Sequence, residues 1–297
     1  MWKLTAIIWF AICAGYAQPP ASLIAEFQER KGILVQTIFV RSDTSRTTIT
    51  SDILLINDFF DTVRGRIRIP NVDHGEYPVA VLVVGIETGR DVVGMIEGHD
   101  SVIVAGIDYP YKGPVDLSGW NSLNAAFALR ETGFATVPQI LLFLDWLFRH
   151  PRADTTDVTM IAVSFGVFTA TPAAAIDRRV RRFVVVQAGG DLTDIIATQS
   201  KRLDVPMPSW LAGWFGSWIL LPFEPNRYIG ALSPRPVLIV SGESDEFFSH
   251  ASVESLFDHA NEPKEWIQHR HPHVVPGEEE LILELTNLVA ERLYGRR

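Results

Sequence analysis

The sequence predicts an α/β protein built on a twisted, mostly parallel sheet, with an antiparallel meander at its N-terminal edge and helices on both faces. Two observations predict this fold class. Residues 36–41, 47–55 and 63–69 are rich in β-branched and aromatic residues and partly alternate in polarity, as antiparallel strands do. After Pro78, short apolar runs alternate with longer helical segments. This alternation is typical of a parallel sheet that helices cover on both faces.

The segments that follow Pro78 can be assigned in order. Apolar runs predict buried strands at residues 79–84, 101–107, 158–163, 183–187 and 237–241. Helical spacing of apolar residues predicts helices at residues 136–150, 165–176 and 278–292. In such sheets the ligand binds beyond the carboxyl ends of the strands, so the residues that follow each strand are the first candidates for chemistry.

Composition narrows the class of protein. The chain has 297 residues, of which 47% are hydrophobic and 21% charged, which favours one large core over a disordered chain. We therefore expect a single domain from residue 18 to 297. The formal net charge of -9 argues against a nucleic-acid partner, because binding to phosphates requires clustered lysines and arginines.

The first 17 residues have the features of a signal peptide. Lys3 is followed by an apolar stretch over residues 4–14, which is too short to span a bilayer, and small residues precede a possible cleavage site before Gln18. We therefore expect export, to the medium or a periplasm, without a stable membrane span. The alternative is an uncleaved segment that tethers the protein to the membrane. Cleavage would remove Cys13, the only cysteine, so the mature chain would have neither a disulfide nor a thiolate nucleophile.

Ser164 is the candidate nucleophile. It follows the predicted strand 158–163 and precedes the predicted helix, in the pattern Ala162-Val163-Ser164-Phe165-Gly166. A sharp turn between strand and helix exposes a serine hydroxyl, and the small residues Ala162 and Gly166 allow the strand and helix to approach each other. The alternative is a serine that only caps the helix.

Asp245 is the candidate triad acid. It follows the strand 237–241 by four residues, where its carboxylate could orient an imidazole and stabilise the charged form of that ring. Glu243 is a rival acid that lies closer to the end of the strand. A turn aspartate that caps the next helix is the structural alternative.

His273 is the candidate general base. The segment from His269 to His273 contains three histidines and precedes the last helix, so a histidine here could reach back to the serine, accept its proton and return it to the leaving group. Pro272 breaks any strand at this point, which favours His273 over His271. The three histidines could instead bind a metal, but the segment offers no carboxylate or thiolate ligand, so we expect no metal.

Backbone N–H groups should stabilise the anion that forms during acyl transfer. Phe165, the residue after the nucleophile, is expected to supply one of them. The loop after strand 79–84 contains Gly85 and Gly89, and we expect its Ile86 N–H to supply the second. The alternative is an ordinary glycine turn.

From about residue 36 to the C-terminus, these segments resemble the α/β-hydrolase family, most closely its esterase and dienelactone-hydrolase-like branches. The order Ser164, Asp245, His273 is that of the family, and the segment after residue 237 is similar to its acid segment. The resemblance implies acyl transfer to Ser164, then hydrolysis by water that His273 activates, without a metal or organic cofactor. It also implies that Asp108 is structural. The chain departs from the family pattern at Ala162, where glycine is usual, and at Val84, where histidine is usual.

Residues 191–236 form a long excursion between two strands, which in this fold often caps the active site. Trp210, Trp214 and Trp218 recur every four residues, so a helix would place them on one face. That face is expected either to pack on the core or to line an apolar acyl pocket. A lid that contacts lipid is disfavoured because the stripe lacks a compensating basic face after Arg202.

The leading functional hypothesis is hydrolysis of a small-molecule carboxylic ester by a serine esterase. The same triad could instead cleave an amide or peptide bond, open a lactone or transfer an acyl group. A hypothesis of a different class is a non-catalytic binding protein on the same fold.

Overall fold

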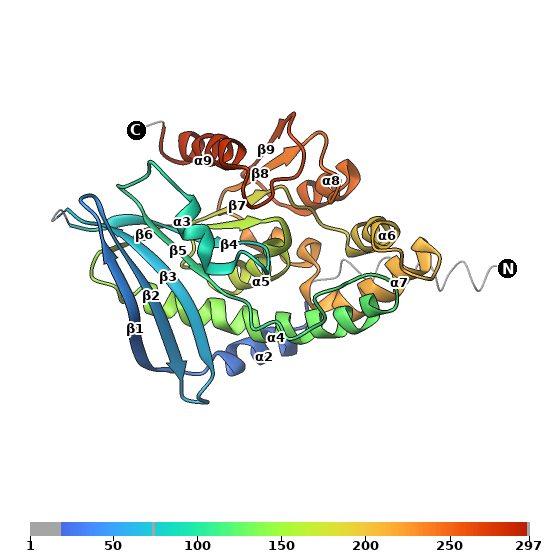
Figure 1. Cartoon of the computed structure of the whole chain (residues 1–297), viewed down its shortest axis with the longest axis horizontal. Coiled ribbons are helices and arrows are strands. Elements are labelled where there is room, and N and C mark those ends of the chain that lie inside the picture. Colours follow the sequence, from blue (N-terminus) through green and yellow to red (C-terminus); the bar gives the residue numbers. More distant parts are fainter. Residues whose placement is uncertain (1–18, 73–74, 296–297) are drawn as a thin grey trace.

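The structure is a computed structural model that describes residues 19–72 and 75–295. In this part of the chain nine strands form one sheet, in the order β1-β2-β3-β5-β4-β6-β7-β8-β9 (Figure 1). The predicted signal peptide, residues 1–17, lies outside the described residues and stays a prediction. Within the described ranges, no helix combines the length and the apolar character that crossing a membrane requires.

The N-terminal edge of the sheet is antiparallel. β1 (Leu34–Thr44), β2 (Thr48–Asn57) and β3 (Thr62–Pro70) pair in sequence order, and β3 pairs antiparallel with β5 (Ile103–Ile107). The predicted meander is therefore confirmed. Its long strands form the curved ribbon at the left of Figure 1.

The remaining strand pairs are parallel, as predicted from the apolar runs. They join β5 to β4 (Tyr77–Val83) and continue through β6 (Ala153–Val163), β7 (Arg182–Val186), β8 (Val237–Gly242) and β9 (Lys264–His269). β9 was not predicted. It is an edge strand without a fully buried residue, and its polar sequence gives no apolar run to find.

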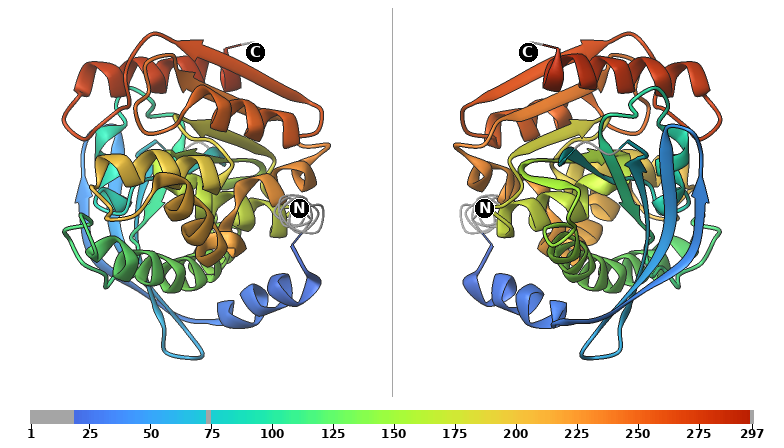
Figure 2. Two further views of the ribbon diagram at one scale, coloured as in Figure 1. Left: turned by 90° about the vertical axis from the view of Figure 1, so that its right-hand side faces the viewer. Right: turned by 90° about the vertical axis from the view of Figure 1, so that its left-hand side faces the viewer.

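Helices cover both faces of the sheet (Figure 2). α4 (Asn121–Leu147), α5 (Val167–Ile176) and α8 (His250–His259) pack on one face, and α2 (Ala21–Lys31) packs on α4. Among the described residues, the α-helices on the other face are α3 (Val92–Met95) and α9 (Glu279–Tyr294). Between β7 and β8, α6 (Leu192–Arg202) and α7 (Ser209–Leu220) pack together at the right of Figure 1.

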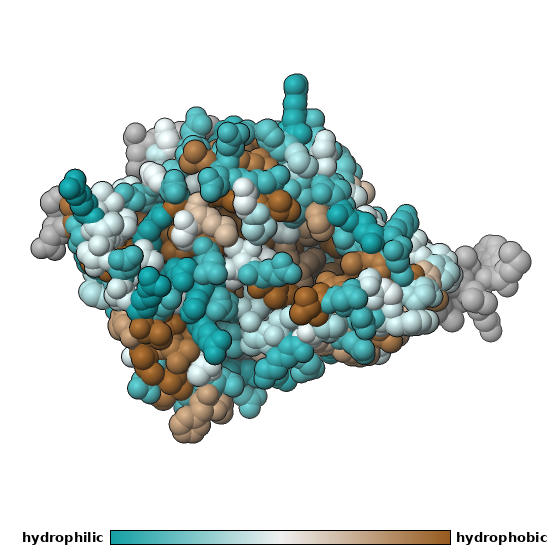
Figure 3. All heavy atoms as spheres, viewed as in Figure 1, coloured by the Kyte–Doolittle hydropathy of each residue, from teal (hydrophilic) through white to brown (hydrophobic). Residues whose placement is uncertain are grey.

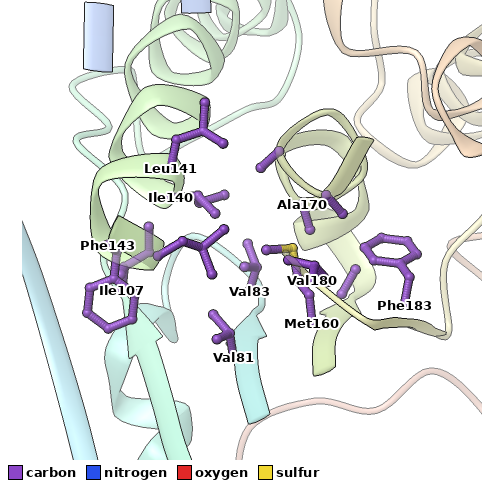
Figure 4. Close-up of a cluster of buried hydrophobic side chains, with 14 of the residues drawn as sticks. Val81, Val83, Ile107, Ile140, Leu141, Phe143, Met160, Ala170, Val180 and Phe183 are labelled. Atoms are coloured by element: carbon purple, nitrogen blue, oxygen red, sulfur yellow. The ribbon is translucent and has the colours of Figure 1, made fainter. Parts of the chain in front are cut away.

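The main core lies between the sheet and the helices α4 and α5. In Figure 4, Ile140 and Leu141 of α4 point toward Val83 of β4, and Ala170 of α5 lies above Met160 of β6. Met160 and Ala170 are fully buried, so the two helices hold the central strands from one side. This packing fixes the carboxyl end of β6, where Ser164 follows.

α4 begins 15 residues earlier than the helix predicted at residues 136–150. Proline is tolerated in the first turn of a helix and disfavoured in its interior. In the structure the helix continues through Pro138. Its earlier half is held by tertiary contacts, since the Phe134 ring packs against those of Phe27 and Phe223. Packing of the helix thus overrides the local preference for ending it at proline.

Candidate active site

Ser164 lies on a strained turn at the carboxyl end of β6. The strand ends at Val163, a single 3-10 turn spans Ser164–Gly166, and α5 follows at once. Ser164 has φ +52°, a left-handed conformation that non-glycine residues rarely adopt. A side chain on Gly166 would overlap the carbonyl oxygen of Val83, so only glycine lets α5 start this close to β4. The turn therefore places the serine hydroxyl beyond the carboxyl end of β6, a central strand.

A chain of two hydrogen bonds connects Ser164, His273 and Asp245. The Oγ of Ser164 lies 2.8 Å from Nε2 of His273, and Nδ1 of His273 lies 2.8 Å from Oδ2 of Asp245. The side chains of His273 and Asp245 are only 5% and 2% exposed. The other carboxylate oxygen of Asp245 accepts hydrogen bonds from the N–H groups of Phe247 and Phe248. The structure therefore brings the three predicted residues together and holds the carboxylate in one orientation.

Gln187, which the sequence analysis did not single out, holds the loop that carries His273. It follows β7, is fully buried and has φ +48°. Its amide donates to the carbonyl oxygen of Pro272 and its oxygen accepts from the N–H of Val274, at 2.7 and 2.6 Å. The side-chain amide of Gln187 thus forms hydrogen bonds to the backbone on both sides of His273. A polar residue directly after a buried apolar strand is the signal that could have found it.

The rival residues lie elsewhere. Nε2 of His271 is 3.0 Å from a carboxylate oxygen of Glu284 on α9, and its side chain is 44% exposed. Glu243 is held through its backbone N–H, which donates to the carbonyl of His269. Burial lowers the pKa of His269, which favours its neutral form. Within the described ranges, no group of three or more His, Cys, Asp or Glu side chains is arranged to hold a metal ion.

The loop after β4 faces Ser164 across the same cavity, with Gly85, Ile86 and Phe165 all in the cavity wall. The N–H of Ile86 has no hydrogen-bond acceptor among the described residues, so it is free to bind a ligand. Tyr109 braces this loop, because its hydroxyl donates to the carbonyl of Val84 at 2.8 Å. Burial raises the pKa of Tyr109, which keeps the hydroxyl protonated and able to donate.

Asp108 holds the other end of this loop. One carboxylate oxygen accepts from the N–H of Arg90 at 3.0 Å, and the other lies 3.5 Å from the guanidinium of the same residue. Gly89, at φ +47°, leaves no room for a Cβ beside this carboxylate. These contacts agree with the structural role that the resemblance implies for Asp108.

A large apolar cavity opens at Ser164. Its volume is about 710 Å³, and its wall includes His273, Ile86 and residues of α4, α6, α7 and α9. In Figure 3, hydrophobic residues surround a hollow between the middle of this face and the α7 end. The site therefore joins polar catalytic groups to an apolar binding space, which is the usual character of a small-molecule site.

The three tryptophans of α7 do not line this cavity. Trp210, Trp214 and Trp218 are 69%, 58% and 64% exposed, so the expectations that they pack on the core or form an acyl pocket are both wrong. The opposite face of α7 is the packed one. There Gly213 and Gly216 leave no room for a Cβ against α6, and the close approach of the two helices turns the tryptophans outward.

We expect Trp214→Ala to leave the acyl-chain preference and the Michaelis constant within about twofold of the parent protein, because a surface side chain away from the cavity contributes little to binding or stability. Kinetics with p-nitrophenyl acetate, butyrate and octanoate would measure this. A rise in the Michaelis constant that is confined to the longer esters would instead indicate that Trp214 contacts the acyl chain of the substrate.

Comparisons with known proteins agree with this fold. The family model described as Serine hydrolase (FSH1) matches residues 162–284, which include Ser164, Asp245 and His273. A search of curated proteins finds no match. Among solved structures, acetyl xylan esterase 1 from Thermoanaerobacterium sp. JW/SL YS485 superposes with a TM-score of 0.64 at 15% identity, covering 93% of this chain and 95% of that one.

Two further solved structures are similar. Acetyl xylan esterase from Paenibacillus sp. R4 gives a TM-score of 0.64 at 15% identity, with 89% of this chain and 92% of that chain covered. An α/β hydrolase from Penicillium sp. sh18 gives 0.58 at 17% identity, with 83% and 99% covered. The chain therefore has the α/β-hydrolase fold, as the sequence predicted. Over residues 162–284 it is similar to the serine hydrolases that the family model describes.

Proposed function

We propose that this protein hydrolyses carboxylic esters through an acyl-enzyme on Ser164, with His273 as general base and Asp245 as the acid that orients it. The hydrogen-bond chain from Ser164 Oγ to His273 and on to Asp245, with both distances at 2.8 Å, carries this proposal. Two proteins of similar structure are acetyl xylan esterases, which favours an ester as the scissile bond.

The proposed reaction has two halves. His273 Nε2 takes the proton of Ser164 as Oγ attacks the ester carbonyl, and Asp245 stabilises the imidazolium that forms. The N–H groups of Phe165 and Ile86 stabilise the oxyanion. Collapse of the tetrahedral intermediate breaks the C–O bond, and His273 returns the proton to the departing alcohol. Water then attacks the acyl-enzyme and gives a proton to His273. His273 passes this proton to Oγ of Ser164 as the acyl–oxygen bond breaks, which releases the acid and the free serine.

Fluorophosphonate labelling tests this proposal, because such reagents react with a serine whose hydroxyl is activated. We expect a single phosphonyl adduct on the peptide that contains Ser164, and none in Ser164→Ala. Ser249, whose hydroxyl lies 2.5 Å from Asp194, provides the matched control: Ser249→Ala should label like the parent. A folded parent protein that takes up no label would contradict an activated serine and favour a non-catalytic binding protein.

The same groups could act on an amide or transfer the acyl group to another acceptor. Parallel assays on p-nitrophenyl acetate and on the corresponding anilide separate ester from amide cleavage, and added alcohol tests acyl transfer. We expect the ester to be the better substrate, because alkoxide leaves a tetrahedral intermediate without the full protonation that an amine requires.

A further inference from the structure

The cavity at Ser164 extends in two directions. One part, here called the cap arm, lies between α4, α6 and α7 and is walled by Leu123, Ala126, Leu129, Ile195, Phe215 and Ile219. The other part, here called the α3–α9 groove, lies over the opposite face of the sheet and is walled by Leu82, Ile96, Ile161, Val163, Leu285 and Val289. Both sets are apolar, and Ser164, which directly follows Val163 of the groove, lines the same cavity.

The α3–α9 groove exists because the helices on this face leave the central strand uncovered. α3 is a single turn and packs on β4 and β5, whereas α9 packs on β7 and β8. β6 lies between them. Its residues Ile161 and Val163 face the groove and are partly exposed, although Met160 and Ala162 on its other face are fully buried. Partly exposed aliphatic side chains on a central strand of a nine-stranded sheet indicate room for an apolar ligand.

Two polar atoms in the groove wall lack partners. Nε2 of His99 and the hydroxyl of Tyr294 are buried, line the cavity and make no hydrogen bond within the described part of the chain. Tyr294 is the last residue of α9 and packs against the α3 cluster, so it lies at the end of the groove away from His273. An apolar chain that covered these atoms would leave them unsatisfied, which is costly. They therefore limit the apolar length of the groove.

Resting on the proposed esterase activity, we propose that the substrate is a lipid ester with an apolar chain on each side of the scissile bond. One chain occupies the cap arm while the other occupies the α3–α9 groove. The two substituents of an ester group leave the reacting carbonyl in different directions, and two apolar arms that meet at Ser164 match that shape. Along β4 from Val84 back to Ala80 the groove runs about 13 Å, which accommodates roughly ten carbons.

The proposal is tested with n-alkyl alkanoates at concentrations below aggregation, followed by acid release. In one series the acyl chain grows from two to twelve carbons with ethanol as the alcohol, and in the other the alcohol grows with acetate as the acid. We expect kcat/KM to rise in both series, by up to about fourfold for each buried methylene. In the series whose chain enters the groove, the rise should stop near ten carbons.

Blocking substitutions assign the arms. Ala290→Phe places a ring in the α3–α9 groove and Ala126→Phe places one in the cap arm, since both alanines line the cavity. Each should flatten the chain-length rise in one series, and the two should act on different series. Asn287→Phe and Asn124→Phe, on the exposed faces of the same helices, serve as matched controls that should retain both rises. If both blocking variants flatten the same series, or if Ala290→Phe flattens neither, the two-arm proposal is wrong.

A binding measurement keeps this test separate from the catalytic proposal. Titration calorimetry of decan-1-ol into Ser164→Ala requires no turnover. We expect binding that Ala290→Phe weakens at least about tenfold, whereas Asn287→Phe leaves it unchanged, because filling the groove removes most of the apolar contact. If Ala290→Phe leaves the affinity for decan-1-ol unchanged, the proposal that the groove binds an apolar chain is wrong, even if the esterase activity is confirmed. Absent fluorophosphonate labelling with intact decanol binding would overturn the esterase proposal alone.

Discussion

His273→Ala is expected to lower kcat for ester hydrolysis by about 10⁶-fold, the size of loss that follows removal of a triad base. Nε2 of His273 is the atom 2.8 Å from the Ser164 hydroxyl, so without it the serine proton has no acceptor. The side chain also contacts the ring of Phe247, with ring centroids 4.6 Å apart. Steady-state kinetics with p-nitrophenyl acetate would measure the loss, and circular dichroism on heating would confirm that the variant is folded.

His271→Ala is the matched control for that experiment. Its imidazole faces Glu284 on the surface of α9, so its removal should leave kcat within about twofold, as is usual for surface substitutions. The two histidines differ by only two positions in the sequence, which makes the pair a direct test of the assignment. Loss of activity in His271→Ala with normal activity in His273→Ala would show that the loop adopts a different arrangement in the working enzyme.

The parts of the fold that were predicted have local signals. Each buried parallel strand from β4 to β8 contains a short apolar run, and α9 is amphipathic, so local sequence patterns find them. The candidate nucleophile and acid follow from the same logic, because Ser164 comes directly after such a strand and Asp245 lies three residues after another. β9 has no run of its own and is defined only by its pairing with β8.

Other features depend on contacts that the sequence does not record locally. The stripe of tryptophans on α7 predicts a helix, but both of its faces carry apolar residues, and only the packing against α6 decides which is buried. Gly213 and Gly216 on the buried face were a usable signal, since small residues permit close helix contact. The two hydrogen bonds from Gln187 to the His273 loop join residues that are separated by 85 and 87 positions in the sequence, so no local pattern predicts them.

The α3–α9 groove likewise could not be predicted from periodicity. The groove forms because α3 spans only four residues and is too short to cover β6. Gly94 and Gly98 flank the end of this turn, and glycine disfavours a longer helix there. A sequence pattern predicts where helices and strands form, but it does not readily predict where the helix layer leaves part of the sheet uncovered. The shape of a binding site on this fold therefore emerges only when the helices are placed on the sheet.

Asp245→Asn is expected to lower kcat by about 10⁴-fold with little change in the Michaelis constant. The reason lies in how the two carboxylate oxygens are used. One accepts from the N–H groups of Phe247 and Phe248, which fixes the asparagine oxygen in that position, because a side-chain NH₂ there would face two donors. The amide NH₂ must then face Nδ1 of His273 and donate to it. The ring proton moves to Nε2, which can no longer accept the proton of Ser164.

This substitution separates a change of proton position from a loss of folding. Because the asparagine oxygen preserves both backbone hydrogen bonds, Asp245→Asn should melt within a few degrees of the parent, whereas Asp245→Ala should lose those bonds and melt lower. Glu243→Gln is the matched control and should keep kcat within about twofold, since Glu243 is held through its backbone. The fluorophosphonate labelling rate of Ser164 should fall together with kcat in Asp245→Asn. A labelling rate equal to that of the parent protein would mean that Asp245 does not set the protonation of His273, and the acid of the triad would have to be another group.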